Sequence, residues 1–351
     1  MSLNRAEAQA DSRHGRTAAR QHGSGARLQG ELLAELRAGE AAFFTLWFGG
    51  MRALSQPPDQ VLIPLPVLGS GPAFEVWTGA AVTRLEAFAG GGLVASAEYL
   101  GLYRSTAIAP GADVAAITRD IYRDLLARQR ELGYPHRVRM WNVVPAINSG
   151  DGVDETYVRF NVGRAAAFDE LSLAEVRYSA ATCVGGAAAT PLTVLALASR
   201  VEPLSIENPR QLSAYQYPRQ YGPRAPSFAR ATLLPDAGGG TLFISGTASI
   251  VGHESRHDAI EPQLAETLTN IRKLREQALT LQPNLVAGER QSWRVYLREP
   301  ADLPAVTRIV HDELGGSGNV VFLQADICRR ELKVEIEGVC ELLAAHPVAP
   351  S

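Results

Sequence analysis

The clearest pattern of hydrophobic and polar positions lies in the C-terminal half of the chain. Leu264, Leu268, Ile271 and Leu274 follow one another at steps of four, three and three residues, which is the spacing of one face of an α-helix. We therefore predict a helix over residues 261–281, preceded by a β-rich run at 241–245. The pattern after it predicts strand 292–297, helix 303–314, strand 319–323 and strand 332–339.

The same order of elements recurs upstream at a distance of about 150 residues. Val114, Ile117, Ile121 and Leu125 mark a helix that ends at Gly133, a residue type common just after a helix. Strand 137–144, helix 156–171, strand 180–184 and strand 192–199 follow. This internal duplication predicts an α+β protein of two fused lobes, each a mixed β-sheet packed with helices. We place the lobes at residues 28–205 and 231–351.

Two segments fall outside this repeat. Residues 1–27 contain no large apolar residue after Leu3, so they bury too little surface to offset the entropy of ordering. We predict a disordered N-terminal tail there, and Glu7 and Asp11 argue against a transit peptide. Residues 206–230 are rich in Pro, Arg, Tyr and Gln. A loop of this length is usually functional or disordered, and we assign it as a separate Arg/Tyr-rich active-site segment.

Composition narrows the class of protein. The chain has 351 residues, 46% of them hydrophobic, which suits a two-domain globular protein. Its net charge of −3 provides no bulk attraction to nucleic acid or to an anionic membrane. No apolar run approaches the roughly 20 residues that span a bilayer, and no signal peptide is visible, so we expect a cytoplasmic protein. The three cysteines have no metal-binding spacing, and their odd number argues against a disulfide framework.

The Arg/Tyr-rich segment concentrates candidate ligands for an anion. In it Arg210 and Arg219 flank Tyr215 and Tyr217. Guanidinium groups bind carboxylates through two parallel hydrogen bonds, and tyrosines add neutral ones. The same residues could stack on single-stranded nucleic acid, which the acidic overall balance disfavours, or could form a solvated inter-domain linker.

A second cationic cluster lies in the predicted helix 156–171. Tyr157 and Arg164 share one face of that helix, whereas Arg159 points elsewhere. Gly163 in the middle of a helix costs about 1 kcal/mol relative to alanine, which indicates the close approach of a ligand or of another backbone. The alternative is a set of arginines on an exposed helix face.

The last predicted strand carries two acidic residues on one face. Glu335 and Glu337 alternate with Val334 and Ile336, so the glutamates face water or a cleft while the apolar side chains are buried. In a partly desolvated cleft the pKa of a carboxyl rises, and the group becomes a general acid near neutral pH. Charges that protect an edge strand from aggregation are the alternative.

Cysteine and histidine give weaker signals. Cys328 precedes Arg329, whose charge could lower the pKa of the thiol; a buried core thiol is the other interpretation. His253 and His257 are four residues apart, but they lie before the helix and lack the His-Glu-x-x-His order. We interpret them as part of a turn and expect no metal site.

Together these pieces resemble a known family. The run Ser245-Gly246-Thr247-Ala248-Ser249-Ile250, the long helix and Val334-Glu335-Ile336-Glu337-Gly338 are similar to RidA/YjgF proteins, small trimer-forming α+β proteins that hold a ligand between neighbouring copies. The second copy and the Arg/Tyr-rich segment narrow the resemblance to chorismatases, which remove pyruvate from chorismate on a RidA-like (chorismate-mutase-like) fold. The resemblance covers residues 60–340.

The resemblance implies a cleft between the two lobes with arginines from both. Chorismate carries two carboxylates, so two cationic clusters are expected. Glu335 matches the general acid that protonates the methylene carbon of the enol ether, and Cys328 stands where the hydroxybenzoate-forming type has cysteine and the hydrolytic type has a smaller residue. The implied substrate-binding residues are Tyr157, Arg159, Arg164, Arg210, Tyr215, Tyr217, Arg219, Gly246 and Ala248.

Several outcomes stay open on the sequence. The favoured product is 3-hydroxybenzoate, with 4-hydroxybenzoate as a further product. The alternatives are hydrolysis to a dihydroxycyclohexadiene carboxylate and a non-catalytic RidA-like carboxylate-binding protein. No cofactor is expected, chorismate is the one small-molecule partner, and the protein is expected to be a monomer or a small homo-oligomer.

Overall fold

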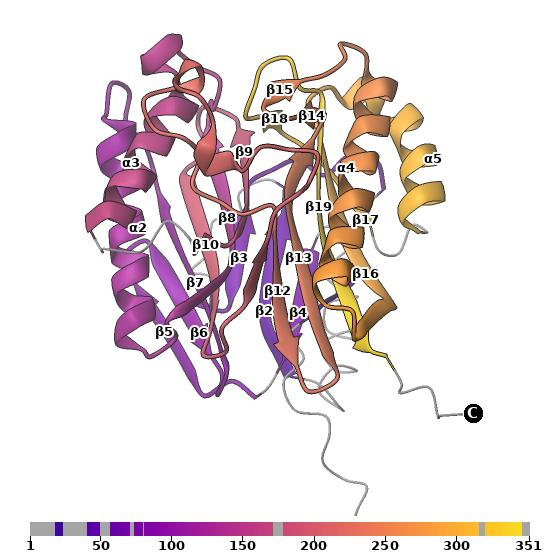
Figure 1. Cartoon of the computed structure of the whole chain (residues 1–351). Coiled ribbons are helices and arrows are strands. Elements are labelled where there is room, and N and C mark those ends of the chain that lie inside the picture. Colours follow the sequence, from indigo (N-terminus) through magenta and orange to yellow (C-terminus); the bar gives the residue numbers. More distant parts are fainter. Residues whose placement is uncertain are drawn as a thin grey trace, which may run out of the picture.

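Two sheets, each covered by two helices, form the outer layers of the molecule (Figure 1). The computed structural model describes residues 18–23, 41–49, 57–70, 74–79, 81–170, 178–315 and 320–345. A third, smaller sheet lies between the two large ones, because its apolar side chains share one core with both of them.

The first large sheet is built almost entirely from the N-terminal half and has the strand order β18-β9-β8-β10-β7-β6-β5. Its elements are β5 (Arg84–Phe88), β6 (Gly91–Ala95), β7 (Tyr99–Thr106), α2 (Val114–Glu131), β8 (His136–Pro145), α3 (Thr156–Glu170), β9 (Ala180–Gly186) and β10 (Leu192–Ser199). Asp113 caps α2 by accepting from the amides of Ala115 and Ala116. Gly133, with φ of 78°, follows its end as predicted.

The second large sheet comes from the C-terminal half and has the order β11-β12-β13-β19-β16-β17. Its elements are β11 (Leu204–Ile206), β12 (Ala231–Asp236), β13 (Gly239–Ala248), α4 (Ile260–Leu281), β16 (Leu285–Leu297), α5 (Leu303–Leu314), β17 (Val320–Gln324) and β19 (Val334–Ala344). β14 (Ile250–Val251) and β15 (Glu254–Ser255) form a small hairpin. The two-residue strand β18 (Asp326–Ile327) crosses over and pairs with β9 of the first sheet.

The internal repeat is present in three dimensions. In each half a helix leads to a strand, a second helix and a parallel partner strand, giving β8–β9 in one sheet and β16–β17 in the other. The last strand of each repeat, β10 or β19, inserts on the other side of β8 or β16. These features confirm the predicted α+β fold of two repeated lobes. β16 starts earlier than predicted, and β19 runs beyond the predicted end.

The third sheet was not predicted from the sequence. It has the order β1-β4-β2-β3, with β1 at Ala18–Gly23, β2 at Ala41–Phe48, β3 at Gln60–Ile63 and β4 at Phe74–Gly79. β1 pairs with β4, so residues 18–23 of the predicted disordered tail form a strand, and the prediction is corrected for them. The other residues of 1–27 lie outside the described residues.

Alternate side chains of each strand pack in different layers of the core. Leu192, Val194 and Ala196 of β10 face α2 and α3. Leu195 and Leu197 of the same strand face the centre, where the three sheets meet. In the second sheet Val334 and Ile336 of β19 face α4 and α5. Glu335 and Glu337 therefore point from β19 towards the other sheets, as strand geometry requires.

Candidate active site

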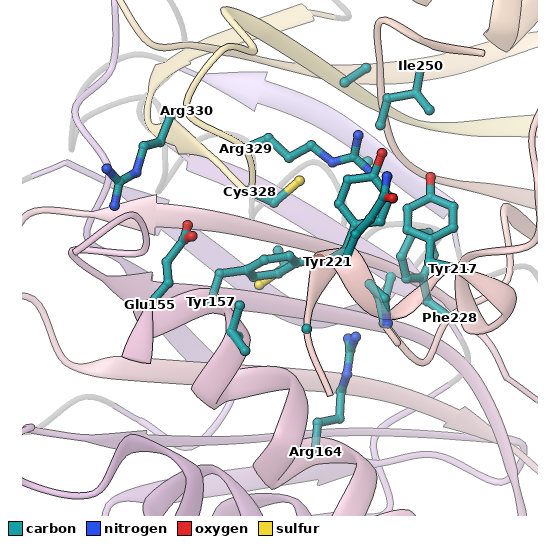
Figure 2. Close-up of a pocket in the computed structure, with 18 of the residues that line it drawn as sticks. Glu155, Tyr157, Arg164, Tyr217, Tyr221, Phe228, Ile250, Cys328, Arg329 and Arg330 are labelled. Atoms are coloured by element: carbon teal, nitrogen blue, oxygen red, sulfur yellow. The ribbon is translucent and has the colours of Figure 1, made fainter. Parts of the chain in front are cut away.

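A cavity of about 630 Å³ lies between the two halves of the chain. Its walls include α3 and β9 from the first half and β13, β19 and the turn 328–331 from the second, while residues 217–230 line a further side. Figure 2 shows side chains from these segments pointing into one space. The cavity matches the cleft between lobes that the sequence predicted.

Glu335 supplies a carboxyl to this cavity from a rigid position. β19 lies between β13 and β16, so the interpretation of Glu335 as an edge-strand charge is wrong. The residue is 4% exposed. Burial, with a smaller contribution from the nearby Glu337 carboxylate, raises the pKa of Glu335 to about 8. The carboxyl group is therefore mainly protonated at neutral pH.

Gly246 of β13 provides the space for this carboxyl group. A Cβ atom added at Gly246 would overlap Oε1 of Glu335, so no residue with a side chain fits there without moving the glutamate. The amide of Gly246 donates to Oγ1 of Thr182 on β9 at 3.0 Å. Ala248, two residues further along the same strand, also lines the cavity.

Glu337 has quite different surroundings from Glu335. Its Oε1 accepts from Arg294 Nη1 at 2.7 Å and from Trp141 Nε1 at 2.9 Å, and its Oε2 accepts from Arg139 Nη2 at 2.7 Å. Arg294 also makes a two-pronged pair with Glu75 of β4. Both oxygens of Glu337 thus accept hydrogen bonds from guanidinium groups inside the protein.

Five arginines line the cavity: Arg164, Arg219, Arg230, Arg329 and Arg330. Among the described residues, three buried nitrogens of these side chains have no hydrogen-bond partner, namely Arg164 Nε, Arg230 Nε and Arg329 Nη2. Buried donors are normally paired, and leaving one unpaired costs free energy. Guanidinium groups that line a cavity are a suitable binding site for anionic oxygens.

Aromatic rings hold two of these arginines in place. The hydroxyl of Tyr217 accepts from Arg230 Nη2 at 2.8 Å. The Arg329 guanidinium lies over the ring of Tyr221, 4.1 Å from its centroid, and Figure 2 shows Arg329 beside Tyr221 and Tyr217. Tyr221 is itself hydrogen-bonded to His253 Nδ1 at 3.1 Å. His253 thus lies in a turn, as predicted, and supports the aromatic wall.

Cys328 lines the cavity with its sulfur towards the open space (Figure 2). Burial, followed by the charge of Glu335, raises the pKa of Cys328 to about 12. Arg329 lowers this pKa, as expected, but desolvation outweighs it and the net change is upward. The side chain is a neutral thiol at physiological pH.

The structure separates the predicted binding residues into two groups. Tyr157, Arg164, Tyr217, Arg219, Gly246 and Ala248 line the cavity. Arg159 does not: its Nη2 donates to Asp113 at 2.7 Å on the outer side of α3. Arg210 pairs with Glu266 of α4 at 2.5 Å and donates to Asn270, and Tyr215 packs on Tyr178. This corrects the expectation that Arg159, Arg210 and Tyr215 line the site, since each has found a partner within the fold.

Sequence reasoning missed several residues of the cavity. Arg230 lies in the Arg/Tyr-rich segment and Arg329 follows Cys328, but neither is among the predicted site residues. The arginine content that indicated the predicted residues applies equally to these two. Thr182 and Cys183 come from β9, where nothing in the sequence indicates a site. Gly163 is explained by packing, because a Cβ there would overlap the Ala115 carbonyl of α2.

The described part of the chain contains no group of three or more His, Cys, Asp or Glu residues arranged to hold a metal ion. Within the same ranges, no helix combines the length and the apolar character that crossing a membrane requires.

The chain is thus a duplicated α+β protein that holds an acidic group and five arginines in one cleft between its two halves. The family model of the N-terminal domain of FkbO/Hyg5-like chorismatases matches residues 75–198. A 3-hydroxybenzoate synthase from Streptomyces hygroscopicus is 38% identical over 233 residues, which cover 63% of this chain and 68% of that protein. The chain belongs to the chorismatase family.

Further relatives agree with this assignment. A chorismatase from Streptomyces rapamycinicus is 38% identical over 248 residues, covering 68% of this chain and 74% of the relative. The crystal structure of a chorismatase superposes with a TM-score of 0.79 at 30% identity, over 93% of this chain and 98% of that one. The superposition thus extends over nearly the full length of both chains.

Proposed function

We propose that this enzyme removes pyruvate from chorismate, with Glu335 as the general acid, and forms 3-hydroxybenzoate. The observation that carries the proposal is a largely protonated carboxyl group in a cavity lined by five arginines, three of whose nitrogens have no hydrogen-bond partner among the described residues. Relatives named chorismatase and 3-hydroxybenzoate synthase support the substrate and the product.

The arginines suit a substrate with two carboxylates. Arg164 reaches the cavity from α3, whereas Arg230 and Arg329 lie on the side of Tyr217 and Tyr221. A dianion held between them would satisfy the unpaired guanidinium nitrogens and leave its apolar ring against the tyrosines and Cys328. Arg219, which is more exposed, lies at the cavity margin and is suited to the initial capture of the anion.

The proposed reaction starts with proton transfer to carbon. Glu335 gives its proton to the methylene carbon of the enolpyruvyl ether, which leaves positive charge on the neighbouring ether carbon. The bond between the ring and the ether oxygen breaks as the adjacent ring hydroxyl oxygen displaces pyruvate. That hydroxyl loses its proton as its oxygen bonds to the ring carbon that held the ether, which forms an epoxide. The epoxide opens at its original carbon–oxygen bond, the freed oxygen takes up a proton, and loss of one ring proton gives the aromatic hydroxybenzoate. Of the two protons released, one ends on the phenol oxygen and the other restores the proton of Glu335. No water is consumed, so chorismate is divided into pyruvate and hydroxybenzoate with all atoms retained.

A neutral Cys328 favours this route over hydrolysis. The thiol fills space beside Glu335 with a group that is only a weak hydrogen-bond partner for water. Replacing it by alanine opens room for a water molecule at the reacting carbon. We expect Cys328→Ala to shift the product from hydroxybenzoate towards the dihydroxycyclohexadiene carboxylate while pyruvate release continues.

The test is incubation of the purified protein with chorismate. Pyruvate and 3-hydroxybenzoate are expected in equal amounts, identified by mass and ultraviolet spectrum, with 4-hydroxybenzoate distinguished by chromatography. In D2O the methyl group of freshly released pyruvate is expected to carry one deuterium, because the transferred proton comes from a solvent-exchanged carboxyl. Binding of chorismate without pyruvate release would overturn the proposal.

A further inference from the structure

A chain of four buried charged residues runs behind the cavity and contacts all three sheets. It consists of Glu75 on β4, Arg294 on β16, Glu337 on β19 and Arg139 on β8, each at most 5% exposed. Glu75 pairs with Arg294 at 2.7 and 2.9 Å, Arg294 pairs with Glu337 at 2.7 Å, and Glu337 pairs with Arg139 at 2.7 Å. None of the four lines the cavity.

The chain also reaches the wall of the site through hydrogen bonds. Arg139 Nη2 donates to the hydroxyl oxygen of Thr182, and that oxygen accepts from the amide of Gly246. Gly246 is the residue against which the carboxyl group of Glu335 lies. The same arginine therefore binds Glu337 and fixes the backbone that supports Glu335.

Glu335 itself takes no part in this pairing. It shows no hydrogen bond or ion pair to any described side chain, although it lies two residues from Glu337 on the same strand face. The charged or titratable groups that face it are Glu337, Arg139 of β8, Arg230, and the thiols of Cys183 and Cys328. Since Arg139 is bound to Glu337, its positive charge is largely neutralised and stabilises the Glu335 anion only weakly.

We propose that the chain Glu75–Arg294–Glu337–Arg139 is a positioning device that keeps Glu335 protonated and in place for proton transfer. The chain contains two positive and two negative charges, so it adds little net potential at Glu335 while it occupies the guanidinium groups of Arg139 and Arg294. In this arrangement Glu337 accepts from the two arginines and Glu335 donates the proton. Through Glu75, the third sheet also contributes a charge to the surroundings of the site. The inference rests on the proposed role of Glu335 and deepens it.

The charges of the four residues provide a test, because one substitution should lower the pKa of Glu335 and a second should restore it. Glu75→Gln leaves the chain with one excess positive charge, so the pKa of Glu335 should fall. Glu337→Gln also removes a negative charge and lies closer to Glu335, so it should lower the pKa of Glu335 as well. A change in a neighbouring charge shifts a pKa by about 1–3 units. Glu75→Gln combined with Arg294→Met restores zero net charge, so the titration of Glu335 should return to near its wild-type position.

The readout is the infrared carbonyl band of the protonated Glu335, assigned by its loss in Glu335→Gln and followed against pH in the full-length protein. Glu341→Gln is the matched control, because Glu341 lies on the same strand, pairs with Arg290 and is outside the cavity. The alkaline limb of kcat/KM for pyruvate release should move with the infrared titration in each variant.

Three outcomes would overturn the inference. They are an unshifted Glu335 titration in Glu75→Gln, an equal shift in Glu341→Gln, and a double variant that shifts as far as Glu75→Gln. If Glu337→Gln does not fold, the Glu75→Gln variant and the double variant still decide the question. Failure of the proposed function is distinct, since it would appear as normal turnover by Glu335→Gln whatever the titration does.

Discussion

Glu335 and Glu337 are chemically identical groups on one strand face, and their surroundings differ. Two guanidinium groups and an indole donate hydrogen bonds to Glu337, whereas burial without such partners keeps the proton on Glu335. A positioned carboxyl group that is protonated near the working pH is suited to general-acid catalysis. Glu335 is therefore the candidate proton donor.

Replacing Glu335 by glutamine tests this assignment most directly. Glutamine keeps the size and hydrogen bonding of the side chain but has no acidic proton. A positioned general acid contributes typically about 10²–10⁴-fold, so Glu335→Gln should lose turnover by at least about a hundredfold while still binding chorismate. Pyruvate release and calorimetric titration measure the two properties, and Glu341→Gln serves as control. Near-wild-type release from Glu335→Gln would show that the acid is another group.

The pH dependence of catalysis follows from the same residue. The active form carries the proton, and the pKa of Glu335 is about 8. We expect kcat/KM to fall by about tenfold per pH unit above this value, because kcat/KM reports the essential acid of the free enzyme. Initial rates of pyruvate release across the alkaline range measure it, and a plateau that continues well beyond the pKa would contradict the prediction.

The contribution of Glu335 to the stability of the fold should fall as pH rises, whereas the contribution of a salt-bridged carboxylate increases with pH. The pKa of Glu335 is raised from 4.5 to about 8 in the folded protein, so the folded state binds a proton that the unfolded state has released. The contribution of this group is therefore fully present below the lower value and is lost as pH rises through the upper one. The slope is at most about 1.4 kcal/mol per pH unit.

Glu335→Gln removes this titration. Relative to wild type, we expect the variant to gain stability progressively between the two pKa values, with no further gain above the upper one. Urea unfolding of both proteins at about pH 5 and about pH 8 checks it. A constant difference between them across this range would mean that burial does not raise the pKa of Glu335.

At the scale of elements, the hydrophobic pattern predicted much of the repeat and little of what surrounds it. Helix α5 and strand β10 have the predicted bounds, because one or both of their faces carry a clear apolar pattern. Strand β4 is buried at nearly every position, so it lacks the alternation that distinguishes a strand from other apolar runs. The partners of Arg159 and Arg210 are distant in sequence, and spacing within a segment could not identify them.

The contact between strands β13 and β19 gives a prediction at this scale. In Gly246→Ala the new methyl group overlaps Oε1 of Glu335, so the carboxyl has to move. A misplacement of about 1 Å can cost about a hundredfold in rate, and we expect kcat to fall by about ten- to a hundredfold. Gly288→Ala is the matched control, because its Cβ meets the Glu341 carboxylate on the other side of β19, away from the cavity. Equal rates in the two variants would contradict the prediction.

At the scale of the whole molecule, three sheets share one central core. Trp77 of β4 is fully buried and stacks on Phe44 of β2 at 5.2 Å, on Phe243 of β13 at 6.0 Å, and edge-on to Trp141 of β8 at 5.4 Å. One residue thus joins the small sheet to both lobes. Sequence patterns contain no sign of such a junction, because its members come from strands far apart in the chain.

Trp77→Ala should therefore lower the stability of the whole protein rather than that of one lobe. Truncation of a buried tryptophan costs about 3–5 kcal/mol, and the cavity created here borders all three sheets. We expect a lower denaturation midpoint with a single transition, measured by urea unfolding followed by both circular dichroism and fluorescence. Separate transitions for the two lobes, or an unchanged midpoint, would show that the sheets do not share a core.

The equivalence of β10 and β19 has a consequence for how such an enzyme can evolve. On the face where β19 carries Glu335 and Glu337, β10 carries Leu195 and Leu197, which pack in the central core. In an assembly of identical subunits, each substitution is inherited by every cleft at once, so acidic residues useful in one place are imposed on all. A tandem duplicate is free of that constraint. One copy can keep a packed apolar face for folding, while the other carries the groups that chemistry requires.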